Sequence, residues 1–283
     1  MKKLLLIAVV ALFSTAVYAD DETWTAVTIS SGFNFDGICE SESAAPTARG
    51  PLDTHGSQIV PQIVSSTGIP NDGALTLDNG HVYQFGNFTA NNCLVLTKSS
   101  AFDNDVTCTS ATLTFSSAVT ADKLGFLVIG CNKENYSLTY KATVNYSDGT
   151  TASFDLETGD WGQSPSDAVY KTNRWRYTAG SNPETGFSGS ICEQTIEVDN
   201  SKSISSVTFD YTIETEDAWG WGYINIFGVS AGTTTAGVNT VEAADNATVS
   251  KVYTTDGKEI SAPTKGVNVI KYNNGEVRKV VVK

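Results

Sequence analysis

Short segments in which apolar and polar residues alternate follow one another along most of the chain. They are rich in Val, Ile, Thr, Tyr and Phe, which favour extended backbone. Turn signals such as Asp78-Asn79-Gly80 separate them, and no segment beyond the N-terminus keeps a helical period. The pattern predicts an all-β protein with a large antiparallel β-sandwich (jelly roll) over residues 20–231. The clearest predicted strands are 111–119, 123–130, 137–146, 151–157, 194–199, 205–214 and 223–229.

The two ends of the chain differ from this body. Residues 1–19 combine two lysines, an apolar run and a small-residue finish, which predicts a secretory signal peptide cleaved before Asp20. This run is shorter than the ~20 residues of a membrane-spanning helix, and no later stretch approaches that length. The small polar residues 232–240 are typical of a linker, and residues 241–283 are a small second unit. We therefore expect a protein without a transmembrane span that is secreted or held at the cell surface.

The charge of the chain limits the classes of partner that it can bind. The chain has a net charge of −13, and the acidic excess lies in the body. Such a surface repels phosphate backbones, so we expect no nucleic-acid partner. One basic cluster departs from this: Lys171, Arg174 and Arg176 lie within six positions of each other, together with Trp175 and Tyr177. Two interpretations stay open, a loop that neutralises nearby carboxylates and a contact for an anionic sugar or a protein.

The chain has five cysteines. Cysteines of exported proteins are usually oxidised, and no C-x-x-C spacing indicates zinc or redox chemistry. We therefore expect two disulfides and one remaining thiol. Cys93 and Cys108, on neighbouring strand-like segments, are the pair we would choose.

Catalytic signatures are sparse, so we expect no enzyme. The only histidines are His55 and His81, and no nucleophile elbow, zinc-binding helix or phosphate loop is present. Glycoside hydrolysis needs only two carboxylates about 5–9 Å apart. Glu214 and Glu216 share a strand face, but alternation along this strand places its carboxylates on the solvated side. An unrecognised glycoside hydrolase remains an alternative.

The aromatic residues offer a binding chemistry. In the stretch from Thr215 to Val229, Trp219, Trp221 and Tyr223 recur at every second position, so a continuous strand would point them to one side. They form either a platform for the apolar face of a sugar or part of the core. Trp161 and Trp175 lie in loop-like segments, so we expect their rings to be exposed, with acidic and basic side chains nearby that could bind sugar hydroxyls. The candidate ligand-binding residues are Trp161, Arg174, Trp175, Arg176, Asp217, Trp219 and Trp221, with Asp160 as a further companion.

Two oxygen-rich loops are candidates for a structural calcium ion, the one at 103–105 and the one at Asn71 and Asp72. Neither has the spacing of an EF-hand, and ordinary turn chemistry explains both. We expect no other cofactor.

The C-terminal unit contains a series of short motifs: Val252-Tyr253, Asp256-Gly257-Lys258, Lys265-Gly266-Val267, Gly275, Lys279-Val280 and Lys283. In these positions the unit resembles the C-terminal sorting domain of type IX secretion, which carries proteins across the outer membrane of Bacteroidota. Matching positions cover roughly the last fifty residues; at Asn268 the family usually has Tyr. The resemblance implies export by outer-membrane secretion machinery, followed by surface display or release.

The body contains three further motifs: Gly32-Phe33-Asn34-Phe35-Asp36, Tyr146-Ser147-Asp148-Gly149-Thr150, and the pair Asp160-Trp161. In these motifs the body resembles the galactose-binding-like jelly rolls of secreted Bacteroidota proteins. In that family the sheet supports a carbohydrate-binding face or loop edge, often with a structural calcium ion. The resemblance implies a carbohydrate ligand. The alternative is an adhesin or capture protein for a host or other extracellular protein.

Overall fold

A computed structural model describes most of the chain beyond the expected signal peptide, which lies outside the described residues. Two compact units are present, Glu22–Thr234 and Thr235–Lys283, and each is considered by itself. The described residues are 21–40, 52–53, 56–99, 107–132, 138–176, 184–216, 220–235 and 248–282.

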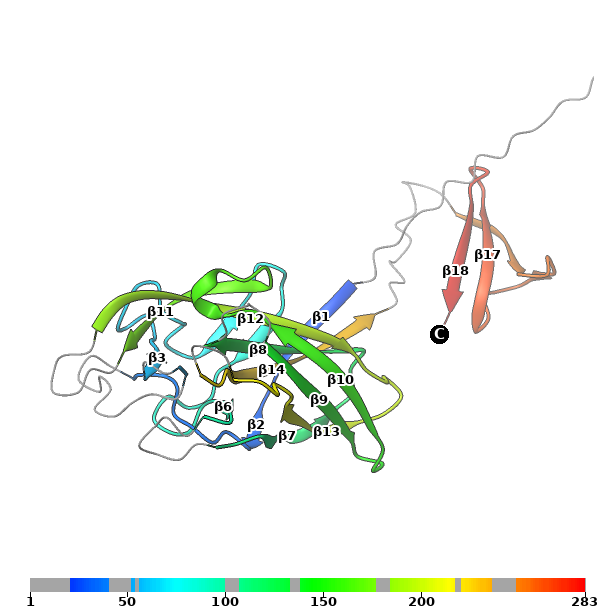
Figure 1. Ribbon diagram of the computed structural model, residues 1–283. Helices are drawn as coiled ribbons and strands as arrows, with labels where there is room; N and C mark the ends of the chain where they lie inside the picture. The colour runs from blue at the N-terminus through cyan, green and yellow to red at the C-terminus, as the bar shows by residue number, and fades with distance from the viewer. Residues whose placement is uncertain are drawn as a thin grey trace, which may run out of the picture. The chain divides into compact units, whose positions relative to one another are not determined.

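The larger unit contains a seven-stranded sheet with the strand order β1-β14-β8-β12-β11-β3, in which β6 also pairs with β14 (Figure 1). Its strands are β1 (Asp21–Val27), β3 (Ser57–Ile59), β6 (Leu94–Leu96), β8 (Lys123–Cys131), β11 (Ala168–Arg176), β12 (Glu184–Glu197) and β14 (Tyr223–Thr235). β14 runs on through the first four residues of the expected linker; it pairs with β8 as far as Gly232 and with β1 on its other edge.

A five-stranded antiparallel sheet with the order β10-β9-β13-β7-β2 lies against it. Its strands are β2 (Ile29–Ser31), β7 (Ser110–Val119), β9 (Leu138–Tyr146), β10 (Thr151–Thr158) and β13 (Ile204–Tyr211). Four of these strands agree closely with the segments predicted from alternation. The prediction of an all-β sandwich is confirmed.

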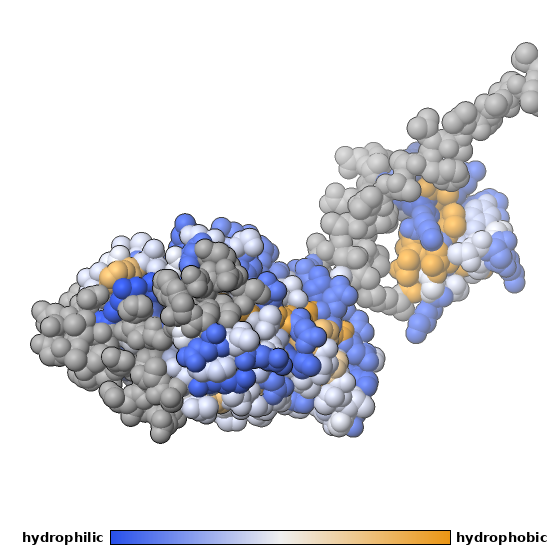
Figure 2. Space-filling model, in the orientation of Figure 1, coloured by the Kyte–Doolittle hydropathy of each residue, from blue (hydrophilic) through white to orange (hydrophobic). Residues whose placement is uncertain are grey.

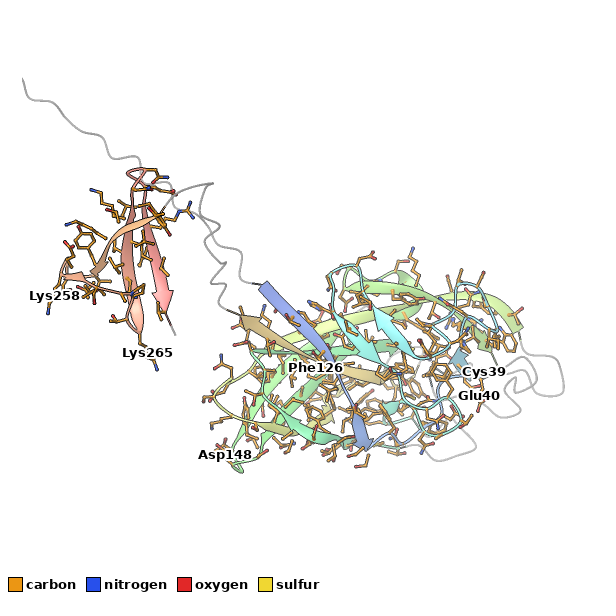
Figure 3. All side chains as sticks on the ribbon, turned by 180° about the vertical axis from the view of Figure 1, so that it is seen from behind. Cys39, Glu40, Phe126, Asp148, Lys258 and Lys265 are labelled. Carbon is orange, nitrogen blue, oxygen red and sulfur yellow. The ribbon has the colours of Figure 1, made fainter. Side chains whose placement is uncertain are left out.

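The main core fills the space between the two sheets. Phe126 of β8 lies inside the sandwich (Figure 3) and meets Phe209 of β13 edge-on, with ring centroids 5.2 Å apart. Alternate residues of β9 and β13 are buried here, and their intervening residues face solvent. This burial on one face is the physical basis of the alternating sequence pattern.

The seven-stranded sheet is buried on its other face as well. A two-stranded sheet of β4 (Ala74–Thr76) and β5 (Val82–Gln84), with loop residues such as Ile38 and Leu52, packs there against Leu127 and Ile129. Eight consecutive residues of β8, from Leu124 to Cys131, are therefore buried. Because both faces of β8 are buried, its sequence is an almost unbroken apolar run instead of an alternating one.

Two motifs behind the resemblance have structural roles in the described chain. Asn34 binds the main chain of Val95 in both directions, accepting at 2.8 Å and donating at 3.0 Å, so it acts like one more strand residue. Asp148 forms the turn between β9 and β10 by accepting from the amide and hydroxyl of Thr150. These hydrogen bonds lower the pKa of Asp148 to about 2.

The expected disulfides are absent: all five cysteines lie in described residues, and no two of them are joined. The predicted pairing of Cys93 with Cys108 is wrong. The thiol of Cys93 lies close to Gly37 and contacts the carbonyl of Phe35, whereas that of Cys108 contacts the carbonyl of Ser110. Burial raises the pKa values of the Cys93 and Cys131 thiols well above normal, so both behave as core residues rather than reactive groups.

The C-terminal unit is a four-stranded antiparallel sheet with the order β16-β15-β17-β18. One face buries Val252, Ile270 and Tyr272. Asn268, at the position where the resembling family usually has Tyr, is fully buried and closes the preceding loop through hydrogen bonds to Thr264. The strands are β15 (Val249–Thr254), β16 (Glu259–Ile260), β17 (Gly266–Tyr272) and β18 (Val277–Val282).

Apolar side chains remain exposed on this small sheet, which shows a hydrophobic patch in Figure 2. Val249, Val277 and Val281 are each about half exposed. Three exposed valines in so small a unit give it an apolar surface available for a partner. Among the described residues of the whole chain, no helix is long and apolar enough to span a membrane.

Candidate functional site

A hollow of the described sandwich, with a volume of about 400 Å³, lies beside a short 3-10 helix, η2 (Trp161–Gln163). η2 packs against β8 and β12 of the seven-stranded sheet, and β10, at the edge of the other sheet, also contacts both strands (Figure 1). The η2 hollow therefore lies where the two sheets meet. Its lining residues are Glu157, Thr158, Gly159, Asp160, Gln163, Ser164, Pro165, Ser166, Asp167 and Gln194.

Local sequence shapes the rim of the η2 hollow. Asp160 caps η2 by accepting a hydrogen bond from the amide of Gly162 at 2.9 Å, as N-cap residues do. Ser164 ends the helix in a left-handed conformation, with φ of 53°. Gly159, just before η2, has to be glycine because a Cβ atom there would lie 2.3 Å from the ring of Pro165. The chain is thus turned back on itself over a few residues.

Three carboxylates line the η2 hollow, and they have different partners. Asp167 accepts hydrogen bonds from Thr158 at 3.1 Å and from Gln194 at 2.7 Å, which link the rim to β10 and β12. Asp160 is engaged in capping η2. Glu157 is exposed and accepts no hydrogen bond from the described chain, so it is the carboxylate most available to a ligand.

An aromatic-cationic stack lies at η2. The ring of Trp161 packs against Gly189, and the guanidinium of Arg174 lies 4.2 Å from the ring centroid. Arg174 also forms a buried ion pair with Asp53, with Nη1 and Oδ2 2.8 Å apart. Burial lowers the pKa of Arg174, and the neighbouring carboxylate of Asp53 opposes this. The stack holds η2, β11 and the segment before β3 together.

The expectation that Trp161 and Trp175 are exposed is wrong, because they are only 2% and 8% exposed. The segment expected to be a loop is strand β11, so its residues alternate between two sides. Trp175 packs with Cys39 and Val60, whereas Arg176 places its guanidinium 3.9 Å from the ring centroid of Phe187. Arg174 is buried too, so these residues do not form the flat cationic-aromatic patch that a protein partner would require.

The aromatic residues that alternate in the stretch from Thr215 to Val229 do not form one platform in the described chain. Tyr223 is fully buried in the outer core of the seven-stranded sheet, whereas the half-buried Trp221 packs against the core between the sheets. β14 starts only at Tyr223, and Gly220 has a φ of 93°, which interrupts the extended backbone needed for strict alternation. Lys98 lies 5.0 Å from the Trp221 ring centroid. Asp217 and Trp219 lie outside the described residues.

Sequence reasoning missed most of the η2 hollow. The run Gly159–Asp167 is rich in Gly, Ser, Pro and Asp, which signals a turn-rich loop but not a cavity. Gln194 comes from β12, and no local pattern connects it to this loop. For Glu157 the sequence predicted only a solvent-facing position at the end of a strand. Of the expected site residues, Asp160 lines the hollow, and Trp161 and Arg174 lie together at η2.

The described residues contain no cluster of three or more His, Cys, Asp or Glu placed to hold a metal ion. In the loop with Asn71 and Asp72, each side chain accepts a hydrogen bond from a nearby main-chain amide. The candidate calcium loop at 103–105 lies outside the described residues, as does His55.

No family model matches this chain, and no curated protein is significantly similar to it.

Proposed function

We propose that this protein is a secreted, cell-surface β-sandwich that binds carbohydrate through the η2 hollow. One observation carries the proposal: the hollow combines carboxylates, carboxamides and hydroxyls in one open space of about 400 Å³. This volume is within the range of small-ligand sites, ~300–1,000 Å³. Sugar hydroxyls both donate and accept hydrogen bonds, so a mixed polar lining of this kind suits them.

The charge of the lining restricts the ligand class. Glu157, Asp160 and Asp167 line the η2 hollow, and no lysine or arginine lies among the described residues of its lining. Anionic sugars such as uronic acids would meet only negative charge there, so the expected ligand is a neutral or amino sugar. Because the ring of Trp161 is buried, recognition would depend on hydrogen bonds rather than on stacking.

Replacing Glu157 and Gln163 together with alanine is expected to weaken glycan binding at least tenfold, since both side chains are exposed in the lining. The measurement is a glycan array with the mature chain, followed by titration calorimetry of the hits. Asp155→Asn is the matched control: this residue lies on the same strand, its side chain is 86% exposed, and it does not line the hollow. Equal loss in both variants, or a blank array, would contradict the proposal; a blank array would favour a protein ligand.

A second candidate function, glycoside hydrolysis, is favoured by one observation: three carboxylates line the same hollow. A hydrolase of this kind uses one carboxyl as acid and another as base or nucleophile. Incubating the array hits with the protein and measuring new reducing ends distinguishes the two functions. Release that is lost in Glu157→Gln would make this site catalytic, whereas binding without release leaves it a lectin-like site.

We further propose that the C-terminal unit directs export through outer-membrane secretion machinery. Its support is the sequence resemblance, together with the exposed valines of the small sheet, which offer a surface for a partner. Deleting residues 241–283 is expected to leave the body in the periplasm of the native host, because the deletion removes the proposed export signal. The body should still fold, since every strand of the sandwich stays in place. Cell fractionation and surface proteolysis measure this outcome. Normal surface display of the truncated chain would contradict the proposal, and fusing 232–283 to a periplasmic reporter tests the converse.

A further inference from the structure

A second hollow lies on the two-stranded sheet that covers the outer face of the seven-stranded sheet. It has a volume of about 290 Å³ and shares no residue with the η2 hollow. We refer to it as the hairpin hollow. Its lining residues are Asn71, Asp72, Gln84, Phe85, Gly86, Asn87 and Phe88.

Gln84 and Asp72 are held in place by the main chain. Gln84 donates from Nε2 to the carbonyls of Asp72 at 3.0 Å and of Phe85 at 3.2 Å. Gly73 makes room for this arrangement, because a Cβ atom there would lie 2.8 Å from Gln84 Nε2, and its φ of 71° suits glycine. Asp72 accepts at Oδ1 from the amide of Ala74 at 3.0 Å. Each side chain is thus bonded at one end, which leaves Gln84 Oε1 and Asp72 Oδ2 as acceptors.

Two asparagines are held in the same manner but offer donors. Asn71 Oδ1 accepts from the amide of Ile63 at 2.6 Å. Asn87 Oδ1 accepts from both the amide and the hydroxyl of Thr89, each at 3.0 Å. With Oδ1 engaged, the Nδ2 groups of Asn71 and Asn87 donate no hydrogen bond within the described chain.

The hairpin hollow also has an aromatic component. Phe88 packs one side of its ring against the outer core and remains partly exposed. Aromatic rings bind the apolar C–H faces of sugar rings, while carboxamides and carboxylates satisfy the hydroxyls around them. The hairpin hollow thus has anchored donors, anchored acceptors and the partly exposed Phe88 in one lining.

From these contacts we infer that the hairpin hollow is a second binding site, which takes one pyranose ring of a neutral sugar. Its volume is near the lower end for ligand sites, ~300–1,000 Å³, so it suits a single ring rather than a chain. Three carboxamides and one carboxylate line it, in contrast to the three carboxylates of the η2 hollow. Because one end of each polar side chain is fixed before the ligand arrives, little side-chain freedom is lost on binding. The inference goes beyond the proposed function, since the two hollows can succeed or fail independently.

The test is a two-dimensional amide NMR titration of the mature chain with the methyl glycosides of glucose, galactose and mannose. At least one glycoside is expected to shift the amide signals of residues 71–74 and 84–89. Asn71→Asp and Asn87→Asp are the variants, because aspartate keeps Oδ1 for Ile63 or Thr89 and replaces only the free donor. Each is expected to weaken this binding at least tenfold. Ile63→Ala is the matched control: its side chain is 72% exposed on the adjoining loop and does not line the hollow, and its amide is retained.

Repeating the titration in the Glu157→Ala, Gln163→Ala variant separates the two sites. Shifts at the hairpin hollow that persist in this variant support the inference, whatever happens at the η2 hollow. Three results would overturn it: no shift at these residues with any of the three glycosides, shifts that are unchanged in both aspartate variants, or an equal loss in Ile63→Ala.

Discussion

Replacing Asp53 with alanine is expected to lower the free energy of unfolding of the sandwich by about 3–5 kcal/mol. Asp53 is 2% exposed, and it pairs with Arg174, whose guanidinium lies against the ring of Trp161. The substitution leaves a buried cation without its partner, and it also removes hydrogen bonds to the amide and hydroxyl of Ser57. Urea unfolding followed by tryptophan fluorescence measures the change, because all five tryptophans lie in the larger unit.

A double-substitution cycle separates the ion pair from simple loss of packing. Arg174→Met combined with Asp53→Leu is expected to recover most of the lost stability, since apolar side chains of similar size need no charged partner. The surface pair of Lys141 and Asp155, 3.5 Å apart, is the control, and Asp155→Ala should cost less than about 1 kcal/mol. If Asp53→Ala costs no more than this control, the ion pair does not hold η2 and β11 together as we describe.

Replacing Glu193 with alanine is expected to cost about 3–5 kcal/mol, the loss of two or three hydrogen bonds to a largely buried carboxylate. Its side chain is 6% exposed and accepts from Tyr83 at 2.5 Å and Asn79 at 2.9 Å, and His81 Nδ1 lies 2.7 Å away. These partners lie on or next to β5, so Glu193 is the polar anchor of the two-stranded sheet. Urea unfolding gives the global effect, and hydrogen exchange should be faster at residues 74–85.

Burial and the charge of Glu193 also raise the pKa of Tyr83, which gives the wild-type chain a pH dependence. A tyrosine in the unfolded chain ionises near pH ~10. Because the folded state resists ionisation, the contribution of Tyr83 is fully present below that pH and is lost as the pH rises above it.

Glu197→Ala is the control for this prediction, because Glu197 is exposed on the same strand and should change stability by less than ~0.5 kcal/mol. An effect of Glu193→Ala no larger than that of Glu197→Ala would show that apolar packing alone holds the two-stranded sheet. Unchanged hydrogen exchange at residues 74–85, despite a global loss of stability, would place the role of Glu193 in β12 instead.

Strands buried on one face were predictable, because a half-buried strand requires alternation in its own residues. β9, β10 and β13 begin and end within a few residues of the predicted bounds. β11 was expected to be a loop, since Lys171, Arg174 and Arg176 resemble a solvated cationic run. It forms a strand because Asp53, which is distant in sequence, and the rings of Trp161 and Phe187, which lie on other elements, accommodate its arginines. Local propensity contains no information about such partners.

The disulfide prediction failed because it, too, depended on contacts between separate segments of the chain. Exported proteins usually oxidise their cysteines, but a disulfide requires two sulfur atoms within bonding distance. Cys93 and Cys108 lie on segments that neighbour each other in sequence, yet their thiols contact different carbonyls. Cys93 lies opposite Phe35 and Cys108 lies opposite Thr97, so the two cysteines are not register partners, and their spacing in the sequence does not determine this register.

By itself, the sequence determined the all-β class, most strands of the five-stranded sheet and the turn at Asp78-Asn79-Gly80, because these depend on residues close together in the chain. Only the tertiary structure decided which aromatic rings are buried and which polar groups share a hollow. Trp161 is enclosed by Gly189 and Arg174, and Gln194 joins the η2 loop from β12. Such contacts form when strands far apart in sequence pair and pack, so the free energy that selects them belongs to the whole sandwich rather than to any one segment.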